Sequence, residues 1–342
     1  MKPVVLFVDD EPNILSGLKR TMRAYAQQWD VLFCLSGVEA LQIIETADVD
    51  VLVTDMRMPE MDGAQLLETV SQKWPGMFRF ALSGEADLDL SCRIVGRSHQ
   101  FLSKPATPDM IYRAIQTPLD LVSDNADFKI DRSRSLFDRI KANPGSLTRL
   151  RELLDAADPD LVEVTGVIIQ DPSLAVRILQ VVNSAYFGRP NATTDIARAV
   201  AVLGLDRISC LLDTDRLGGE QDAAPSAGPD RQFLAQAALI ARTRAAANGA
   251  TAEQMAAAYA TVLFAQLAQE SDRFADGSAE WNHLPAYVCA LFGLPAALVR
   301  SLVHLGGCNS EWNTAQELGT LAAQCAASHG KVAAPHVEAA HK

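Results

Sequence analysis

Short apolar runs alternate with helical patterns along the first 120 residues of the chain. Five runs have the length and composition of strands: Val4–Val8, Val31–Leu35, Val51–Thr54, Met77–Leu82 and Gln100–Ser103. After Pro12, apolar residues recur at helical spacing at Ile14, Leu15, Leu18 and Met22. Strands that alternate with helices predict an α/β domain with a doubly wound, five-stranded parallel sheet and helices on both faces.

Polar residues stand where these predicted strands end. The run Val51–Val53 is apolar on both faces, which is typical of a central parallel strand, and it leads to Asp55. Asp9 and Asp10 follow the first strand, Ser83 the fourth and Lys104 the fifth. One such residue alone is more often a turn former or a helix cap. Since the carboxyl ends of parallel strands share one edge of the sheet, where ligands collect, the set together predicts a site.

The predicted site has the composition of a phosphoryl acceptor. Packed carboxylates raise one another's pKa unless a cation lies among them, and a hard ion with oxygen ligands, Mg²⁺ by preference, suits this edge. Asp55 can then attack phosphorus, while Lys104 and the metal offset the charge on the phosphoryl oxygens. Ser83 is placed to donate a hydrogen bond to the new group, and Phe101 to report the movement of its loop.

From Leu147 onward the patterns are helical. Leu174, Ile178, Leu179 and Val182 form one apolar stripe after Asp171-Pro172, and Ile196, Ala199, Val200 and Leu203 form another that ends at Gly204. After the loop-like segment 218–230, helical patterns cover Phe233–Leu267, Pro285–Val303 and Ala315–Ser328. We expect a second, all-α domain, divided into two lobes by the 218–230 segment.

The joint between the two domains is the one positively charged part of the chain. Pro118, Ser123, Asp124 and Asn125 interrupt the last helical pattern of the first domain, and a helical stretch with Lys129, Arg132, Arg134, Arg139 and Lys141 follows. We predict a first domain at 1–122, a helical linker at 123–142 and a second domain at 143–335. The basic residues form either a solvated face or a dock for an acidic surface.

Composition excludes several classes of protein. The 342 residues carry a formal net charge of -12, whereas nucleic-acid binders need a surplus of Lys and Arg. We find no apolar run that approaches the roughly 20 residues of a membrane span. The six cysteines are scattered without metal-ligand spacing, so we expect reduced thiols in a cytoplasmic protein.

The strand-end residues belong to longer motifs. Val8-Asp-Asp-Glu-Pro12, Thr54-Asp-Met-Arg-Met-Pro-Glu-Met-Asp-Gly63, Leu82-Ser-Gly84 and Phe101-Leu-Ser-Lys-Pro105 resemble the receiver domain of two-component response regulators. The resemblance implies the flavodoxin-like strand order 2-1-3-4-5. It also implies that Asp55 is the phosphoacceptor and that Asp9, Asp10, Asp55 and the backbone carbonyl of Arg57 bind Mg²⁺. Ser83 and Phe101 would be the switch pair, and the Lys104–Pro105 bond would be cis.

The second domain resembles the HD-related output domain, HDOD. The segments that carry the likeness are Gln170-Asp-Pro-Ser-Leu174, Leu179–Gly188 and Ala199–Ile208, with a weaker one at Ala286–Arg300. An HD hydrolase needs spaced histidines and a His-Asp pair. Ala265 and Gln266 stand where that pair is expected, and His283 and His304 have no carboxylate beside them. The resemblance therefore implies a non-catalytic binding domain.

The sequence predicts a response regulator of a two-component phosphorelay. A sensor histidine kinase or a phosphotransfer protein would phosphorylate Asp55, and the HDOD domain would then bind an unidentified protein. The chemistry we expect is limited to self-phosphotransfer by the receiver. The alternative is a metal-dependent HD-type nucleotide or cyclic-dinucleotide phosphodiesterase. A transcription factor would need a basic recognition helix, which we do not find after residue 151, so DNA binding is not expected. The sequence does not decide whether the chain forms a homodimer.

Overall fold

Five parallel strands form the sheet of the N-terminal part, in the order β2-β1-β3-β4-β5. They are β1 (Val4–Val8), β2 (Asp30–Cys34), β3 (Val51–Asp55), β4 (Phe78–Ser83) and β5 (Gln100–Ser103). Every residue of β3 is buried, so the strand that is apolar on both faces lies in the middle of the sheet, as predicted. The computed structural model describes residues 2–84, 96–124, 140, 142–183, 193–213, 231–270, 283–307 and 319–324.

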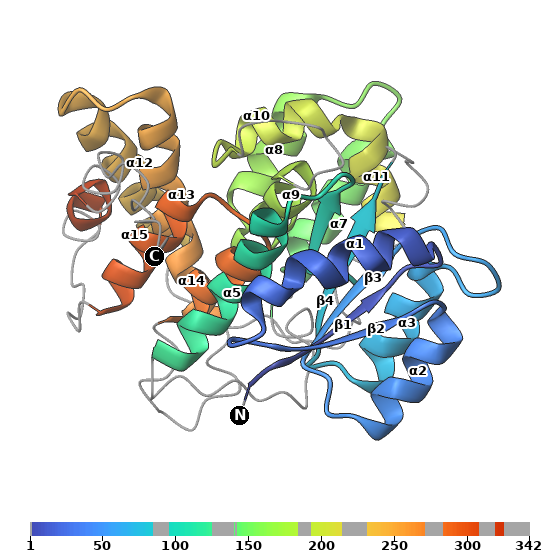
Figure 1. The fold of residues 1–342 in the computed structure, drawn as a ribbon. Coiled ribbons are helices and arrows are strands. Elements are labelled where there is room, and N and C mark those ends of the chain that lie inside the picture. The colour runs from blue at the N-terminus through green and yellow to red at the C-terminus, as the bar shows by residue number, and fades with distance from the viewer. Residues whose placement is uncertain are drawn as a thin grey trace.

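Helices cover both faces of this sheet (Figure 1). They are α1 (Pro12–Met22), the short helix η1 (Arg23–Tyr25), α2 (Gly37–Thr46), α3 (Gly63–Lys73) and α5 (Pro108–Asp124). Helix α1 contacts α5, and α2 contacts α3. The doubly wound fold is confirmed. Within α1, Leu15 and Met22 are buried as predicted, whereas Ile14 is exposed.

The predicted break at Pro118 is wrong. Helix α5 continues through Pro118 to Asp124, beyond the predicted domain end at residue 122. A proline inside a helix removes one backbone hydrogen bond and crowds the preceding turn, which is costly in an isolated helix. Here α5 packs against α14 of the second domain and against α1. Tertiary contacts therefore outweigh the local preference. The basic linker residues lie outside the described part, and the three domain bounds remain predictions.

The rest of the described chain is helical. It comprises α7 (Pro144–Leu154), α8 (Leu161–Ile169), α9 (Pro172–Asn183), α10 (Ile196–Leu203), α11 (Leu205–Asp213), α12 (Arg231–Ala247), α13 (Ala252–Glu270), α14 (Leu284–Leu291) and α15 (Ala296–Gly307). The four residues predicted for the stripe of α10 are its buried residues, and Gly204 follows it with φ +77°. The all-helical class of the second domain is thus confirmed, while segment 218–230 lies outside the described residues.

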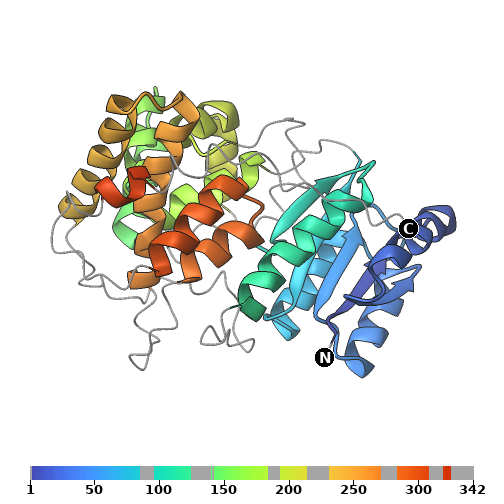
Figure 2. The ribbon, with the colours of Figure 1, turned by 60° about the vertical axis from the view of Figure 1, so that its left-hand side comes forward.

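The hydrophobic core does not divide at the boundary between the two domains. One connected cluster of buried residues runs from the sheet through α7–α11 to α13 and α14. A second, alanine-rich cluster lies among α12, α13 and α15. Helix α14 packs on α5 of the first domain, and α5 lies on the side of the sheet that faces the helical domain (Figure 2).

The cysteines only partly follow the sequence prediction. Cys34 and Cys289 are buried free thiols, and burial, as the largest cause, raises the pKa of both. Cys210 on α11 is disulfide-bonded. The expectation of reduced thiols throughout the chain is therefore wrong for Cys210. Among the described helices, none combines the length and apolar character needed to cross a membrane.

His99 is a buried titratable group next to β5. The ring Nδ1 of His99 accepts a hydrogen bond from the backbone N–H of Arg79 at 3.0 Å, and the backbone N–H of His99 donates to the Arg79 carbonyl at 2.8 Å. The ring stands edge-on to Phe78, with 6.3 Å between centroids. Burial first, and the charge of Arg79 second, lower the pKa of His99 well below its ordinary value of 6.5. The imidazole is therefore neutral in the folded chain at physiological pH.

We predict that His99 makes the chain acid-sensitive. Below about pH 6.5 the unfolded chain binds a proton at His99 that the folded chain excludes, so the free energy of unfolding falls by about 1.4 kcal/mol per pH unit. His99→Asn, which keeps a hydrogen-bond acceptor, should lose less stability than wild type between pH 7.5 and 5.5. Urea unfolding at the two pH values measures this difference. Identical losses in both proteins would contradict it.

Candidate functional site

Three side chains meet at the carboxyl edge of the sheet. Asp9 follows β1, Asp55 ends β3 and Lys104 follows β5. The Lys104 Nζ lies 2.6 Å from Oδ2 of Asp9 and 2.5 Å from Oδ1 of Asp55. Asp9 is 1% exposed and Asp55 7% exposed. The strand-end residues at 9, 55 and 104 are therefore brought together, and one ammonium group bridges two buried carboxylates.

Backbone donors hold the two carboxylates in place. The other oxygen of Asp9, Oδ1, accepts from the N–H of Glu11 at 3.0 Å. The other oxygen of Asp55, Oδ2, accepts from the N–H of Arg57 at 2.9 Å. Each oxygen of the two carboxylates thus receives at least one donor, which meets the requirement that a buried charge be both paired and hydrogen-bonded.

The electrostatics of Lys104 reflect this position. Its partial burial lowers its pKa, but the hydrogen bonds and charges of Asp55 and Asp9 outweigh burial, and the net pKa is raised above 10.5. A raised pKa means that the stabilisation by Lys104 is fully present below about pH 10.5 and is lost only as the pH rises through the folded-state value. At neutral pH the site therefore contains a fixed positive charge.

Gly63 fixes the loop after Asp55. A Cβ at Gly63 would lie 2.1 Å from the Asp55 carbonyl oxygen, so no other residue fits without moving the backbone. The Gly63 N–H donates to the Met56 carbonyl at 3.1 Å. Directly before it, Asp62 accepts from the Gln65 N–H at 2.7 Å, and Gln65 Oε1 accepts from the Asp62 N–H at 3.0 Å. This capping box starts α3 and ties the loop to that helix.

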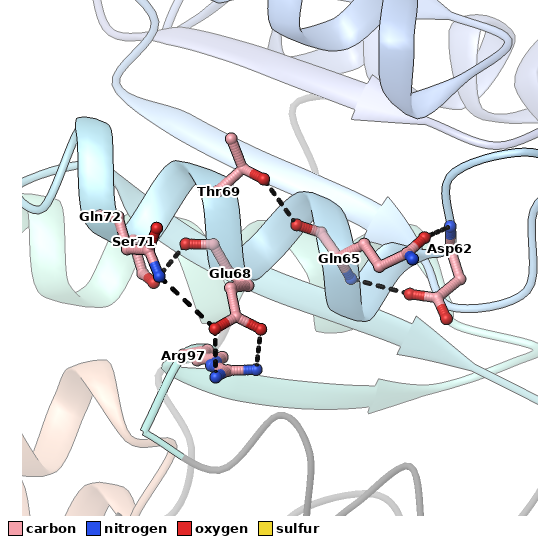
Figure 3. A network of polar contacts seen from close by, with 7 residues as sticks. All are labelled: Asp62, Gln65, Glu68, Thr69, Ser71, Gln72 and Arg97. Atoms are coloured by element: carbon pink, nitrogen blue, oxygen red, sulfur yellow. Dashed lines mark hydrogen bonds and ion pairs between the residues drawn. The ribbon is translucent and has the colours of Figure 1, made fainter.

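Helix α3 is connected in turn to the segment that leads into β5. Figure 3 shows Glu68 of α3 in a two-pronged ion pair with the guanidinium of Arg97. Ser71 and Gln72 bond to Glu68 from the next turn of α3, at 2.7 Å and 3.5 Å. The Arg97 carbonyl also accepts from Nε of buried Arg79 at 2.6 Å. Sequence reasoning missed the link between Glu68 and Arg97 because the two residues are 29 positions apart in the chain.

The predicted magnesium ligands are only partly assembled. Asp10 is half-buried beside Asp9, and the Arg57 backbone lies next to Asp55. Within the part of the chain that is described, no three Asp, Glu, His or Cys side chains gather closely enough to hold a metal ion. Lys104 lies between Asp9 and Asp55 instead. Carboxylate and carbonyl oxygens are nevertheless the donors that Mg²⁺ takes, so the residues present fit that ion chemically.

The predicted switch residues lie on the two strands farthest from β2. Ser83 is the last residue of β4, and its side chain is outside the described part. Phe101 is buried in β5, where it pairs in register with Ala81. Their roles remain predictions. The Lys104–Pro105 peptide bond is cis, as the resemblance implied.

The helical domain shows no described metal centre. Ala265 is half-buried on α13, and the side chain of Gln266 is outside the described part. His283 stands before α14, where burial lowers its pKa, and His304 is exposed on α15. Among the described residues of this domain, no three His, Cys, Asp or Glu side chains lie close enough together to hold a metal ion.

Models of known protein families match both parts of the chain. The response regulator receiver domain matches residues 5–116, and the HDOD domain matches residues 140–269. The chain is a receiver domain followed by an HDOD domain. The receiver match includes Asp9, Asp55 and Lys104, and the HDOD match begins shortly before α7 and ends within α13.

Curated relatives match only part of the chain. The transcriptional regulatory protein GlrR of Escherichia coli is 34% identical over 119 residues, which are 34% of this chain and 26% of the relative. A protein-glutamate methylesterase/protein-glutamine glutaminase of Rhodospirillum rubrum is 29% identical over 174 residues, 48% of this chain and 46% of that protein. The chain thus spans about a quarter of the length of GlrR and under half of the second relative.

Solved structures also match the receiver part. The signal receiver domain of an HD domain-containing protein from Pseudomonas fluorescens is 27% identical and covers 36% of this chain and all of its own, with a TM-score of 0.34. A response regulator receiver domain protein from Clostridium thermocellum is 30% identical, covers 34% of this chain and 92% of its own, and has a TM-score of 0.32.

We predict that Lys104 keeps the acidic site stable. Lys104→Gln leaves two buried carboxylates facing each other. We expect it to lower the free energy of unfolding by about 2 kcal/mol at pH 7. This is less than the cost of breaking a fully buried ion pair, because the Lys104 side chain is 24% exposed. The deficit should be smaller at pH 5 than at pH 7, because acid weakens the repulsion between two facing carboxylates. Urea unfolding at both pH values measures it.

The matched control is Lys73→Gln. Lys73 lies 4.0 Å from Glu45, with both side chains 58% exposed, so its loss should change stability by only about 0.5 kcal/mol. Equal effects of the two variants, or a deficit at Lys104 that does not depend on pH, would show that the bridge between Asp9 and Asp55 does not stabilise the fold.

Proposed function

We propose that this chain is a response regulator in which a sensor histidine kinase or a phosphotransfer protein phosphorylates Asp55. The observation that carries the proposal is the placement of Asp55 at the carboxyl edge of the central strand, with Lys104 and the Arg57 N–H on its two oxygens. The receiver match covers this whole site. The HDOD domain is the output part, and phosphorylation changes what it binds.

The transfer moves one phosphoryl group between two nucleophiles. An oxygen of the Asp55 carboxylate forms a bond to phosphorus, the bond from phosphorus to the donor's imidazole nitrogen breaks, and the nitrogen keeps the electron pair. The product is an acyl phosphate on Asp55. Lys104 is close enough to both Asp9 and Asp55 to offset the added negative charge.

Magnesium is the proposed cofactor of this step. The carboxylates of Asp9, Asp10 and Asp55 and the carbonyl of Arg57 would hold it. When bound, the ion supplies positive charge that neutralises the phosphoryl oxygens. Ser83 and Phe101 are the proposed switch residues, since they belong to the adjacent strands β4 and β5 that lead to the site.

The HDOD domain is proposed as a non-catalytic binding domain. Ala265 and Gln266 occupy the positions where a His-Asp pair would be expected. Its partner is proposed to be a protein. The relatives that are named as transcriptional regulators share only about the receiver length with this chain, so their names do not assign DNA binding to it.

Phosphorylation of Asp55 is tested by treating the full chain with acetyl phosphate and Mg²⁺. We expect a mass increase of one phosphoryl group that hydroxylamine removes, because the linkage is an acyl phosphate. Asp55→Asn should abolish the increase, and so should removal of Mg²⁺ with a chelator. Intact-protein mass spectrometry measures it.

The matched control is Asp48→Asn, an exposed aspartate before the same strand, which should accept phosphate as wild type does. Labelling of Asp55→Asn at the wild-type level would refute the assignment of the acceptor.

The phosphodiesterase alternative is tested on the same protein. The full chain supplied with Mg²⁺ or Mn²⁺ should not hydrolyse a cyclic dinucleotide, because Ala265 and Gln266 stand where the metal-binding His-Asp pair would be expected. Chromatography of the nucleotide after incubation measures hydrolysis. Turnover that disappears in both His283→Ala and His304→Ala would establish a catalytic HDOD domain.

A further inference from the structure

Two buried glutamines, one in each domain, donate hydrogen bonds to backbone carbonyls of the other domain. Gln100, the first residue of β5, donates from Nε2 to the carbonyl oxygens of Ala290 at 3.1 Å and Leu291 at 3.0 Å, at the end of α14. Gln180 of α9 donates from Nε2 to the carbonyl oxygens of Ser98 at 3.0 Å and His99 at 2.9 Å, just before β5. Each domain thus lends one amide group to two consecutive carbonyls of the other. We name Gln100 and Gln180 the glutamine clasp.

The backbone around the clasp is shaped to admit it. Gly293, just after α14, has φ +70°, and a Cβ there would lie 2.8 Å from Oε1 and 2.9 Å from Cδ of Gln100. A side chain at this position would displace the amide of Gln100. Beside the clasp, the rings of Phe78 in β4 and Tyr287 in α14 pack with 6.1 Å between centroids. The position that the Gln100 amide occupies is therefore available only because residue 293 has no side chain.

The clasp closes an interface that excludes water. All eight residues of α14 are buried, as is every residue of α9 from Pro172 to Val182. Helix α14 contacts both α5 of the receiver and α13 and α15 of its own domain. Separation of the domains would expose this apolar surface to water and break the four hydrogen bonds that Gln100 and Gln180 donate, and the exposure of apolar surface is unfavourable.

The clasp is nevertheless not fully satisfied. Oε1 of Gln180 is buried and has no hydrogen-bond donor in the described part of the chain. A buried polar atom without a partner costs free energy, so the closed arrangement is less stable than a fully bonded one. Such a contact is suited to reversible release.

Strand β5 begins at Gln100 of the clasp and leads to Lys104 of the acidic site. Gln100 and Lys104 are four residues apart, about 13 Å along an extended strand. Lys104 bridges Asp9 and Asp55, and the segment before Gln100 is anchored to α3 through Arg97 and Glu68. The backbone of β5 therefore joins the acidic site directly to Gln100.

We propose that the glutamine clasp holds α9 and α14 on the receiver in the unphosphorylated chain, and that a phosphoryl group on Asp55 releases it through β5. The second half of this proposal rests on the proposed function. The closed state keeps the α9 and α14 surfaces inside the molecule. The released state exposes the faces of α9 and α14 that the receiver covers in the closed state.

Hydrogen exchange on the full chain tests the clasp without phosphate. We expect Gln100→Ala, Gln180→Ala and the double variant to speed exchange in β5 and α14, by about tenfold in the double variant. Exchange in α2 should stay unchanged. Gln42→Ala, which removes an exposed glutamine of α2, is the matched control and should match wild type throughout. Wild-type exchange in β5 and α14 of the double variant would overturn the clasp.

A second pair of variants separates the clasp from a general loss of folding. Gly293→Ala should speed exchange in α14 because its methyl group displaces the Gln100 amide. In a chain that already carries Gln100→Ala, Gly293→Ala should increase the exchange rate in α14 much less. The Gln100 amide that its methyl group would displace is then absent, and only the cost of an alanine at positive φ remains. Fully additive effects would overturn the proposed fit between Gly293 and Gln100.

The link to Asp55 is tested with beryllofluoride and Mg²⁺, which mimic an acyl phosphate. Wild type should show faster exchange in β5 and α14, and Asp55→Asn should show no response. A response confined to the loop 55–63 would overturn release of the clasp while leaving the proposed function intact. No response at all, with the clasp variants behaving as expected, would instead refute the proposed function and the coupling.

Discussion

The ion bridge between Lys104 and the two buried carboxylates of Asp9 and Asp55 is the constraint on which the rest of the receiver depends. Two carboxylates that are almost wholly buried cannot both stay charged unless a cation and hydrogen-bond donors surround them. The parallel sheet meets this need because β1, β3 and β5 end at the same edge. Lys104 spans the end of the sheet from β5 to β1, and the loops after Asp9 and Asp55 turn their backbone N–H groups inward.

The same constraint explains why the loop after Asp55 is so tightly specified. Gly63 is the one residue type that allows the backbone to pass the Asp55 carbonyl, and Asp62 with Gln65 starts α3 immediately afterwards. A rigid helix therefore begins within a few residues of the carboxylate. Glu68 on that helix binds Arg97, so α3 and the start of β5 are joined by a second route besides the sheet itself.

Each of the two family matches covers one domain, whereas the contacts between the domains are seen only in the structure. A continuous core passes from the sheet into α9 and α14, and α14, late in the sequence, packs on α5. A phosphoryl group at the edge of the sheet would therefore act on an interface that is already formed. Phosphorylation can only shift the equilibrium between arrangements of the two domains that already exist. The arrangement that the phosphorylated site favours therefore decides whether the interface opens or closes.

Four features were predictable from a local pattern or from a motif read along the chain. They are the polar residues at the strand ends, Gly63 at the start of α3, the stripe of α10 and the cis bond at Pro105. Both fold classes followed for the same reason. Tertiary structure alone decided that Lys104 bridges Asp9 and Asp55, that α5 continues through Pro118, and that Gln100 and Gln180 join the domains. These contacts link residues that are tens to nearly two hundred positions apart, and a polar side chain becomes a donor across an interface only when the fold brings distant carbonyls within reach.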